Sequence, residues 1–349
     1  MVNTSIFVQG IGAVSPAGWG MDAFRDALKK NTSLPTKELS RPASDRKLHV
    51  RQVPAPPTRP SFLAHPRLRR TSPITQYAIA AALEALGQDS EKITQGELRL
   101  GIVFCVMSGC VNYSRRFYDE ALRDPSTASP LVFPETVFNA PSSHLAALLK
   151  TNAINYTIVG DPGTFLEGIA LAADWLTSGK VDGCLVIGAE EVDWITSDAY
   201  RRFQRKVILS DGAGALYLKT KSDSVEAAQL TAVTSAHPFL KSQSRHCAAA
   251  KMRAELPGSA AGTLLSDGIQ NLPVLDSAEK NAWRDWNGER VSVKTILGEG
   301  LMAAAAWQCV AAVDAVRTKR SSAANVSVVG CNQQAIGAQF VMSNSISSF

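Results

Sequence analysis

The stretch LMAAAAWQCVAAVDAVR, residues 301–317, is the feature that most restricts the fold of this chain. Its composition predicts a long helix, and its alanines leave it with small side chains on every side. Such a helix can pack closely on two opposite faces, as a helix buried between two sheets must. Because strand-like and helix-like segments alternate along the rest of the chain, we predict an α/β protein built in layers.

Apolar runs bounded by glycine and proline define the other expected elements. Strands are expected at residues 5–16, 99–109, 154–160, 182–191, 212–220, 227–236 and 289–298, and two more around a turn at 325–343. Further helices are expected at residues 72–87, 142–150, 165–179 and 247–256. Ser72, Pro73 and Gly87 are the start and stop signals of the first of these helices.

Composition excludes several classes of protein. The chain has 349 residues, 45% apolar and 19% charged, which suffices for a substantial core and for two domains. No apolar run reaches the ~18 residues that a membrane span needs, and the first residues do not resemble a signal peptide. Six cysteines at irregular spacing, without a CxxC pair, predict reduced thiols rather than disulfides or zinc. We therefore expect a cytoplasmic protein without metal or cofactor.

Residues 41–70 form a basic, proline-rich stretch. It contains eight basic residues against the single acid Asp45, and the basic residues are Arg41, Arg46, Lys47, Arg51, Arg59, Arg67, Arg69 and Arg70. The prolines predict an extended surface loop, which is either simply solvated or a docking surface for an acidic partner. Nucleic acid is not expected, because Phe62 is the only aromatic residue in the stretch and the net charge of +5 is modest.

The pair Gly10 and Gly12 suggests a dinucleotide-binding loop only superficially. The third glycine of that motif is absent, and Pro16 interrupts the place where the phosphate-binding helix should begin. We do not expect a nucleotide site here.

Residues 157–191 read as a strand, a tight turn, a helix and a second strand, an arrangement that often presents a nucleophile. The turn is Gly160-Asp161-Pro162-Gly163, which contains no Cys, Ser or Lys. The arrangement that would hold a reactive side chain is therefore present without the side chain.

Five segments in register make the chain resemble the β-ketoacyl synthases of the thiolase superfamily almost from end to end. They are VQGIGAVSPAGWG, RLRRTSPITQYAIAAALEAL, the block from FPETVFNAPSSHL to Gly188-Ala189-Glu190, LSDGAGALYL and GCNQQAIGAQFV. The resemblance implies a thiolase-like five-layer αβαβα fold of two similar halves, here residues 1–222 and 223–349. It also implies dimerisation through the strand at 154–160, whose free edge needs a partner.

The same resemblance implies that the catalytic residues are missing. The family uses a Cys to carry an acyl thioester and two His residues to stabilise the developing charge. Pro162 stands at the Cys position, or Asp161 or Gly163 if the register slips by one, while Asp267 and Glu299 stand at the two His positions. Lys294 near the second His motif is kept. The chain's histidines lie outside the catalytic segments, at His49, His65, His144, His237 and His246.

We therefore expect a catalytically degenerate subunit similar to a chain length factor. Such a subunit pairs with an active ketosynthase and shapes the tunnel for a polyketide, polyene or fatty-acid-like chain carried by acyl carrier protein. The candidate tunnel residues are Cys105, Met107, Ser108, Phe133, Phe138 and Asn139. The candidate contacts to the carrier protein are Arg67, Arg69 and Arg70.

Two other functions stay open at this point. The fold could carry an active acyltransferase or decarboxylase with a displaced nucleophile such as Cys110 or Ser108, or it could be a stand-alone acyl-binding scaffold. An aryl polyene pathway is one candidate context. The length of the product, its starter unit and the identity of the ketosynthase partner do not follow from one chain. We also expect the isolated chain to self-associate, because strand 154–160 is apolar.

Overall fold

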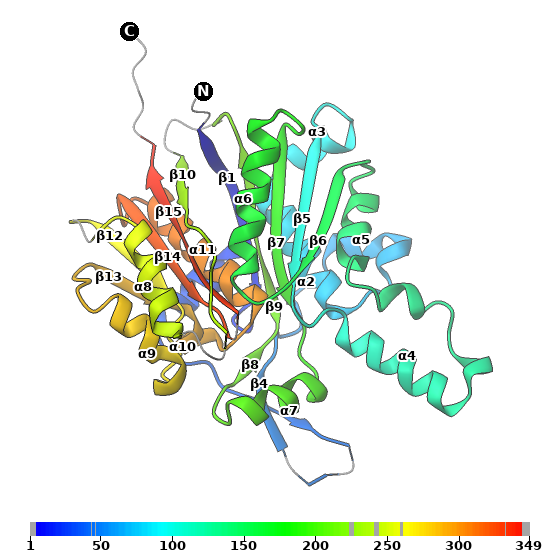
Figure 1. The fold of residues 1–349 in the computed structure, drawn as a ribbon. Helices are drawn as coiled ribbons and strands as arrows, with labels where there is room; N and C mark the ends of the chain where they lie inside the picture. Colours follow the sequence, from blue (N-terminus) through cyan, green and yellow to red (C-terminus); the bar gives the residue numbers. More distant parts are fainter. Residues whose placement is uncertain are drawn as a thin grey trace.

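A computed structural model describes residues 5–42, 44–45, 47–222, 227–240, 244–258, 261–331 and 333–343 of the chain. Its main sheet has the strand order β13-β12-β14-β15-β10-β1-β9-β7-β5-β6 (Figure 1). In the first part of the chain the strands are β1 (Ile6–Ser15), β5 (Leu100–Val106), β6 (Ile154–Val159), β7 (Gly183–Glu190) and β9 (Gly212–Lys219). In the second part they are β10 (Ala228–Val233), β12 (Thr263–Asp267), β13 (Glu289–Ser292), β14 (Ala323–Val329) and β15 (Gln334–Met342).

The two parts of the sheet have the same topology. In the first, β1 runs antiparallel to β9 and β9 antiparallel to β7, whereas β7, β5 and β6 run parallel. In the second, β10 runs antiparallel to β15 and β15 antiparallel to β14, whereas β14, β12 and β13 run parallel. The parts join where β1 pairs antiparallel with β10. The chain therefore consists of two similar halves.

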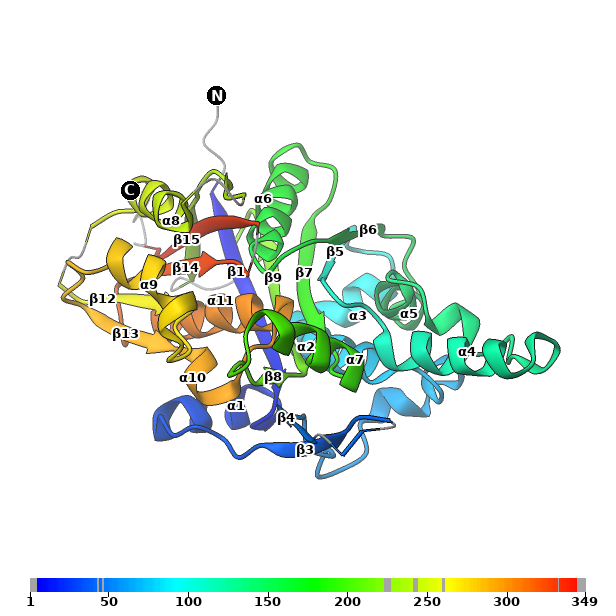
Figure 2. The same ribbon diagram turned by 60° about the horizontal axis from the view of Figure 1, so that its bottom comes forward.

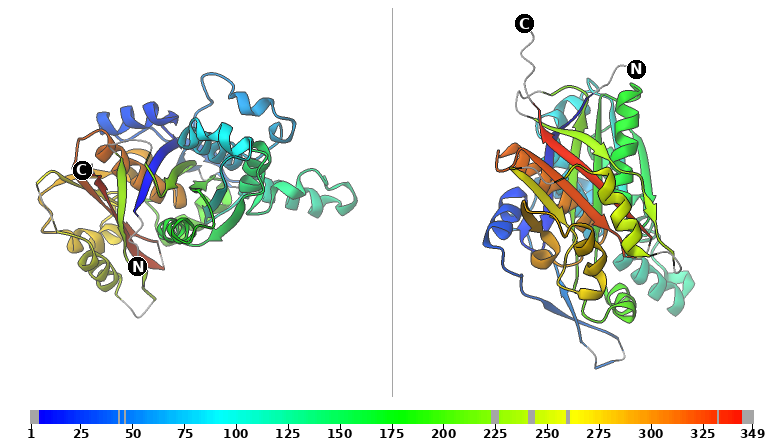
Figure 3. Two further views of the ribbon diagram at one scale, coloured as in Figure 1. Left: turned by 90° about the horizontal axis from the view of Figure 1, so that it is seen from above. Right: turned by 60° about the vertical axis from the view of Figure 1, so that its left-hand side comes forward.

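The helices form three layers, separated by the two parts of the sheet (Figures 1 and 3). The middle layer contains α6 (Thr164–Thr177) and α11 (Met302–Arg317). On the outer face of the first half lie α2 (Pro73–Leu86) and α5 (Ala140–Leu148), and on that of the second half lie α8 (Arg245–Glu255) and α9 (Pro273–Ala282). This is the five-layer arrangement that the resemblance implies, so the predicted fold class is confirmed.

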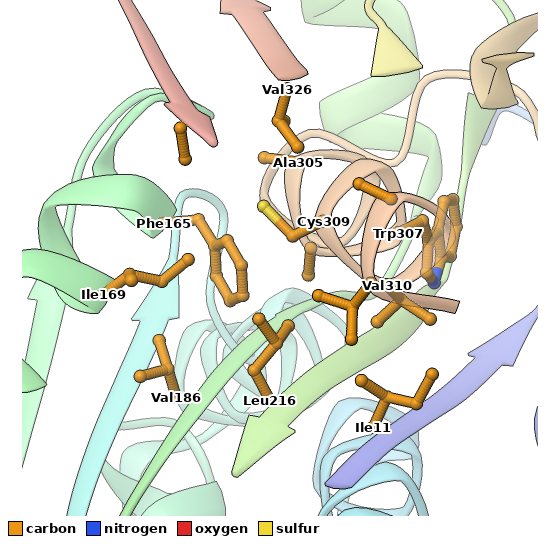
Figure 4. Close-up of a cluster of buried hydrophobic side chains, with 14 of the residues drawn as sticks. Ile11, Phe165, Ile169, Val186, Leu216, Ala305, Trp307, Cys309, Val310 and Val326 are labelled. Carbon is orange, nitrogen blue, oxygen red and sulfur yellow. The ribbon is translucent and has the colours of Figure 1, made fainter. Parts of the chain in front are cut away.

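The alanine-rich helix α11 contacts both halves, as its composition predicts. In Figure 4 its residues Ala305 and Cys309 lie between Phe165 of the first half and Val326 of the second. The approach is close, because Cβ atoms built on Gly188 and Gly214 would lie 3.0 and 2.8 Å from the Cβ atom of Ala306. A larger side chain at Ala306 would separate the helix from the sheet.

Gly10 and Gly12 have a packing role. A Cβ atom on Gly10 would lie 1.8 Å from the carbonyl oxygen of Ala85, and one on Gly12 would lie 2.1 Å from that of Ala81. Both carbonyls belong to α2, so the two glycines let this helix lie directly on β1.

The remaining elements surround the lower end of the molecule and its edges. A small second sheet has the order β3-β4-β8, formed by β3 (Lys37–Ser40), β4 (Lys47–Arg51) and β8 (Leu209–Ser210). The other helices are α1 (Met21–Lys30), α3 (Asp89–Thr94), α4 (Val111–Arg123), α7 (Trp194–Phe203) and α10 (Val293–Leu297). Short strands β2 (Gly18–Trp19) and β11 (His237–Pro238) pair with β1 and β15, and 3-10 turns cover Ser61–Ala64, Pro66–Leu68, Pro125–Thr127 and Phe133–Glu135.

Two sequence-based expectations are wrong in part. Residues 41–70 are not one extended loop, because β4 within them pairs with β3 and β8 and buries Leu48 and Val50. Residues 289–298 are not one strand, because β13 ends at Ser292 and α10 follows. Arg46 lies outside the described residues, as do residues 223–226 next to the proposed boundary of the halves, so that boundary stays a prediction.

The strand β6 forms an open edge of the main sheet. Its residues Ile154, Tyr156 and Val159 are 38%, 55% and 51% exposed, although apolar side chains are usually covered. Residues 111–139, which begin with α4 and end before α5, project away from the body (Figures 1 and 3). We call these residues the arm. Among the described residues, no helix is long and apolar enough to cross a membrane.

Candidate functional site

The turn between β6 and α6 is held by a buried carboxylate. Asp161 is 1% exposed, and its Oδ1 accepts a hydrogen bond from the backbone N–H of Gly163 at 2.9 Å. Its Oδ2 accepts another from the N–H of Gln333 at 3.1 Å, in the turn between β14 and β15. Gly330 leaves room for this contact, since a Cβ atom there would lie 1.9 Å from Oδ2. Asp161 therefore ties together the two turns that meet at the site, and Pro162 beside it offers no nucleophile.

The carboxylate of Asp267 closes the end of β12. Its Oδ1 accepts hydrogen bonds from the Ser292 hydroxyl at 2.5 Å and from the N–H of Ile269 at 3.3 Å. Arg290 lies 3.4 Å from Oδ2. Burial raises the pKa of Asp267 despite these partners. Three neighbours of its own chain thus hold this carboxyl in place.

A buried ion pair occupies the second position. Lys294 Nζ lies 2.8 Å from Glu299 Oε2, and both side chains are less than 5% exposed. Glu299 Oε1 accepts a hydrogen bond from the N–H of Leu301 at 2.9 Å, and its Oε2 accepts one from Gln270 Nε2 at 3.3 Å. Burial alone would lower the pKa of Lys294, but the charge of Glu299 raises it above its ordinary value. The pair is therefore a salt bridge between a charged lysine and a carboxylate.

Sequence reasoning missed Glu279 as a further buried acid beside these groups. Its Oε1 accepts hydrogen bonds from the N–H of Gly268 at 3.1 Å and from the hydroxyl of Ser327. Burial, and then the charge of Asp267, raise the pKa of Glu279 above its usual range. Glu279 lies on α9, a helix that the sequence analysis did not predict, so nothing indicated that its side chain would reach the end of β12.

Sequence reasoning also missed Cys331, the thiol at the turn that contacts Asp161. The hydroxyl of Tyr200, from α7, makes a hydrogen bond with this thiol. Burial, and then the charge of Asp161, raise the pKa of Cys331 to about 11. A thiol with that pKa is almost wholly protonated at neutral pH, whereas the nucleophilic form is the thiolate.

Two of the histidines form contacts with glutamates. His144 Nε2 lies 2.7 Å from Glu135 Oε1, and His237 Nε2 lies 2.5 Å from Glu255 Oε1. Within the described ranges, no hydrogen bond or ion pair joins an imidazole to Asp161, Glu299 or Cys331. His49, His65 and His246 lie on β4, between the two 3-10 turns and on α8.

The displaced nucleophiles considered from sequence, Cys110 and Ser108, lie between β5 and α4. Cys110 is 1% exposed, its thiol donates to the carbonyl of Val137 at 3.6 Å, and burial raises its pKa to about 12. Ser108 donates its backbone N–H to Glu190 Oε2 at 3.0 Å. Neither group contacts an imidazole in the part of the chain that the structure describes.

The two acids at the end of β7, Glu190 and Glu191, have a structural role. Glu190 accepts hydrogen bonds from the N–H groups of Met107 and Ser108, at 2.5 and 3.0 Å, and burial raises its pKa to about 8. Glu191 accepts from the N–H groups of Ile74 and Asn112, at 3.1 and 2.8 Å, and burial raises its pKa to about 7. The two acids thereby fix the loop after β5 and the starts of α2 and α4.

The structure divides the candidate tunnel residues into two groups. Cys105 is buried in the core, where its thiol lies 3.8 Å from the Thr164 carbonyl oxygen, and Met107 and Ser108 are half-buried after β5. Phe133, Phe138 and Asn139 instead lie exposed on the arm. The second group can line a cavity only where another molecule packs against the arm.

The candidate carrier-protein contacts are accessible. Arg67, Arg69 and Arg70 are all exposed, on the second 3-10 turn of the basic stretch and just after it. Among the described residues, none of them lies within 4 Å of a carboxylate.

Comparisons with known proteins agree with this architecture. Residues 3–224 match the family described as "Beta-ketoacyl synthase, N-terminal domain". A β-ketoacyl-[acyl-carrier-protein] synthase III from Prochlorococcus marinus (strain NATL2A) is 30% identical over 91 residues, which is 26% of this chain and 26% of that protein. The aligned part thus spans about a quarter of that relative.

Two solved structures extend the likeness over the whole fold. The ishigamide ketosynthase/chain length factor matches with a TM-score of 0.77 and 16% identity, over 97% of this chain and 99% of its own. A ketosynthase in complex with its chain length factor from Xenorhabdus doucetiae matches with a TM-score of 0.76 and 15% identity, over 97% and 98%. The chain therefore has the fold of these proteins, and, because the family match covers more than half of its length, it belongs to the β-ketoacyl synthase family.

Proposed function

We propose that the chain is a non-catalytic subunit of chain length factor type, which pairs with an active ketosynthase and shapes the tunnel for its growing acyl chain. The observation that carries the proposal is the saturated polar network at the site. Asp161, Asp267 and the Lys294–Glu299 pair all bind groups of their own chain. None of them is left to accept an acyl group or to donate to an enolate.

The exposed edge supports a partner at β6. Apolar side chains of this strand and of the adjoining arm are 38% to 68% exposed: Tyr118, Leu122, Leu131, Phe133, Val137, Phe138, Ile154, Tyr156 and Val159. A partner strand would satisfy the free edge and cover these side chains together. The tunnel would then be built across the interface, with Phe133, Phe138 and Asn139 facing the partner.

Arg67, Arg69 and Arg70 are the proposed contacts for acyl carrier protein, because they are exposed cations without a carboxylate within 4 Å among the described residues. The pathway that we propose makes a polyketide or a polyene, including the aryl polyene type. Its product length depends on the partner as much as on this chain.

Co-expression with an active ketosynthase, followed by acylation of the purified pair, tests the proposal. We expect a heterodimer by light scattering, and an acyl thioester on the ketosynthase alone by intact mass. A thioester on this chain, for example on Cys331, would overturn the non-catalytic assignment. A chain that stays alone beside every ketosynthase tested would favour the stand-alone scaffold.

A further inference from the structure

A cavity of about 450 Å³ lies between β4 and α7, which are neighbours at the lower end of the molecule (Figures 1 and 2). Its walls include Leu48 and His49 of β4, Ser197 and Arg201 of α7, and Arg205 and Lys206 just after α7. We call it the β4–α7 pocket. Its volume is in the range of small-molecule sites.

The pocket carries positive charge that the described residues leave uncompensated. Arg201 donates only to the backbone carbonyl of Lys47, at 3.5 Å, and no carboxylate of the described residues lies within 4 Å of Arg201, Arg205 or Lys206. The other cations nearby differ in this respect. Arg41 and Arg202 both pair with Asp198, at 3.3 and 3.6 Å.

The wall of the pocket also holds a buried hydroxyl without a partner. Ser197 is 7% exposed, and its Oγ makes no hydrogen bond in the described part of the chain. A buried hydroxyl without a partner is costly, so it usually has one. The apolar side chains Leu48 and Leu209 beside it offer none.

We propose that the β4–α7 pocket binds the phosphate group of a phosphorylated small molecule. Guanidinium groups bind phosphate oxygens through two N–H groups, a lysine adds a point charge, and a serine hydroxyl donates a further hydrogen bond. The apolar wall suits the remainder of such a ligand. The proposal goes beyond the proposed function and does not depend on it, because the pocket shares no residue with β6, the arm or Arg67, Arg69 and Arg70.

Calorimetric titration of the complete chain, at constant ionic strength, tests the pocket. The probes are inorganic phosphate, adenosine monophosphate and, as a control without phosphate, adenosine. We expect saturable binding of both phosphates and none of adenosine. Tighter binding of the monophosphate would identify an organic phosphate ester as the ligand, and equal binding would identify free phosphate.

Variants make the test specific. We expect Ser197→Ala to weaken phosphate binding several-fold, and the double variant Arg201→Gln, Arg205→Gln to weaken it at least tenfold. Because Lys206 is exposed, Lys206→Gln should not disturb folding. We expect it to weaken phosphate binding less than the double variant does. The matched control Lys251→Gln, Arg284→Gln removes the same charge at exposed positions elsewhere and should leave binding unchanged.

Absence of saturable binding by the unaltered chain would overturn the proposal, as would equal weakening by the control. Either result would leave the heterodimer test untouched, so the two proposals fail separately.

Discussion

At the residue scale, the candidate site consists of carboxylates that already accept hydrogen bonds within the chain. Asp161, Asp267 and Glu299 each accept hydrogen bonds from groups of the chain itself. A thiolate placed among them would meet negative charge and little solvent, and both raise the pKa of a thiol. Cys331 shows the effect, since burial and Asp161 hold its pKa near 11.

Restoring the thiol should therefore not restore the reaction. We expect Pro162→Cys to remain unacylated after incubation with an acyl thioester donor. Among the described residues no imidazole is hydrogen-bonded at the site to take the thiol proton, and the charge of Asp161 disfavours the thiolate. Intact mass spectrometry measures the result, with an active ketosynthase as the positive control. Stoichiometric acylation of Cys at position 162 would show that the site can still activate a nucleophile.

Asp211 gives a prediction about pH. Burial raises its pKa from 3.8 to about 7. The folded state therefore holds the proton more tightly than the unfolded state between these values, so the free energy of unfolding falls as pH rises through this window. One such proton changes that free energy by at most about 1.4 kcal/mol per pH unit.

We expect Asp211→Asn to flatten this dependence between pH 5 and 7, because the amide does not titrate. The amide oxygen can still accept from the N–H of Val53, which lies 3.3 Å from Oδ1 of Asp211. Urea unfolding at several pH values measures the slope. The exposed change Asp285→Asn serves as the control. An unchanged slope in Asp211→Asn would contradict the raised pKa.

At the scale of elements, strand β6 and the arm with α4 decide how the chain associates. The strand has an unpaired edge in the main sheet, and half of the surface of Tyr156 and Val159 is exposed. An apolar, unpaired edge favours association with another strand.

We expect the isolated chain to elute as a species larger than its 37.3 kDa monomer. Adding charge to the edge with Tyr156→Lys and Val159→Lys should weaken association at least tenfold, because burying two charges is costly. Multi-angle light scattering over a range of concentrations measures this. Val274→Lys, at a position 77% exposed on α9, is the control, and a monomeric unaltered chain would contradict the prediction.

At the scale of the whole molecule, α11 joins the two halves by polar as well as apolar contacts. Trp307 Nε1 donates to the carbonyls of Val14 and Ala213 in the first half, at 3.2 and 3.0 Å. Gln308 Nε2 donates to the carbonyl of Ser327 in the second half, at 2.7 Å. Because one helix satisfies groups of both halves, we expect them to unfold together.

Enlarging one alanine of α11 should destabilise both halves at once. We expect Ala306→Leu to lower the free energy of unfolding by roughly 3 kcal/mol, because Gly188 and Gly214 leave no room at this point. Calorimetry should still show a single transition at a lower temperature. Ala254→Leu, at an exposed position of α8, is the control, and two separate transitions would contradict joint unfolding.

Local signals in the sequence predicted much of the fold. Pro73 and Gly87 bound α2 as expected, and the small side chains of 301–317 predicted a helix between two sheets. The pairing of strands that lie far apart in the chain could not be predicted from such local signals. β4 was missed because its partners β3 and β8 lie before it and far after it in the chain. α10 was missed because its β-branched residues resemble a strand.

The candidate site, too, could be predicted from the sequence only in part. The positions Pro162, Asp267 and Glu299 came from motif order, which the sequence contains. The partners of these residues came from the structure: Gln333 for Asp161, Arg290 and Ser292 for Asp267, and Gln270 for Glu299. Cys331 and Tyr200 could not be connected beforehand, because 130 positions separate them and only the packing of α7 brings them together.

By itself, the sequence determined which side chains stand at the motif positions of the family and which layers the chain builds, because the identity of a side chain and the period of apolar residues are local properties. Only the tertiary structure decided that the remaining acids are bound, that β6 and the arm are uncovered, and that a cationic pocket opens between β4 and α7. Those features depend on contacts between segments far apart in the chain, whose geometry no local pattern specifies.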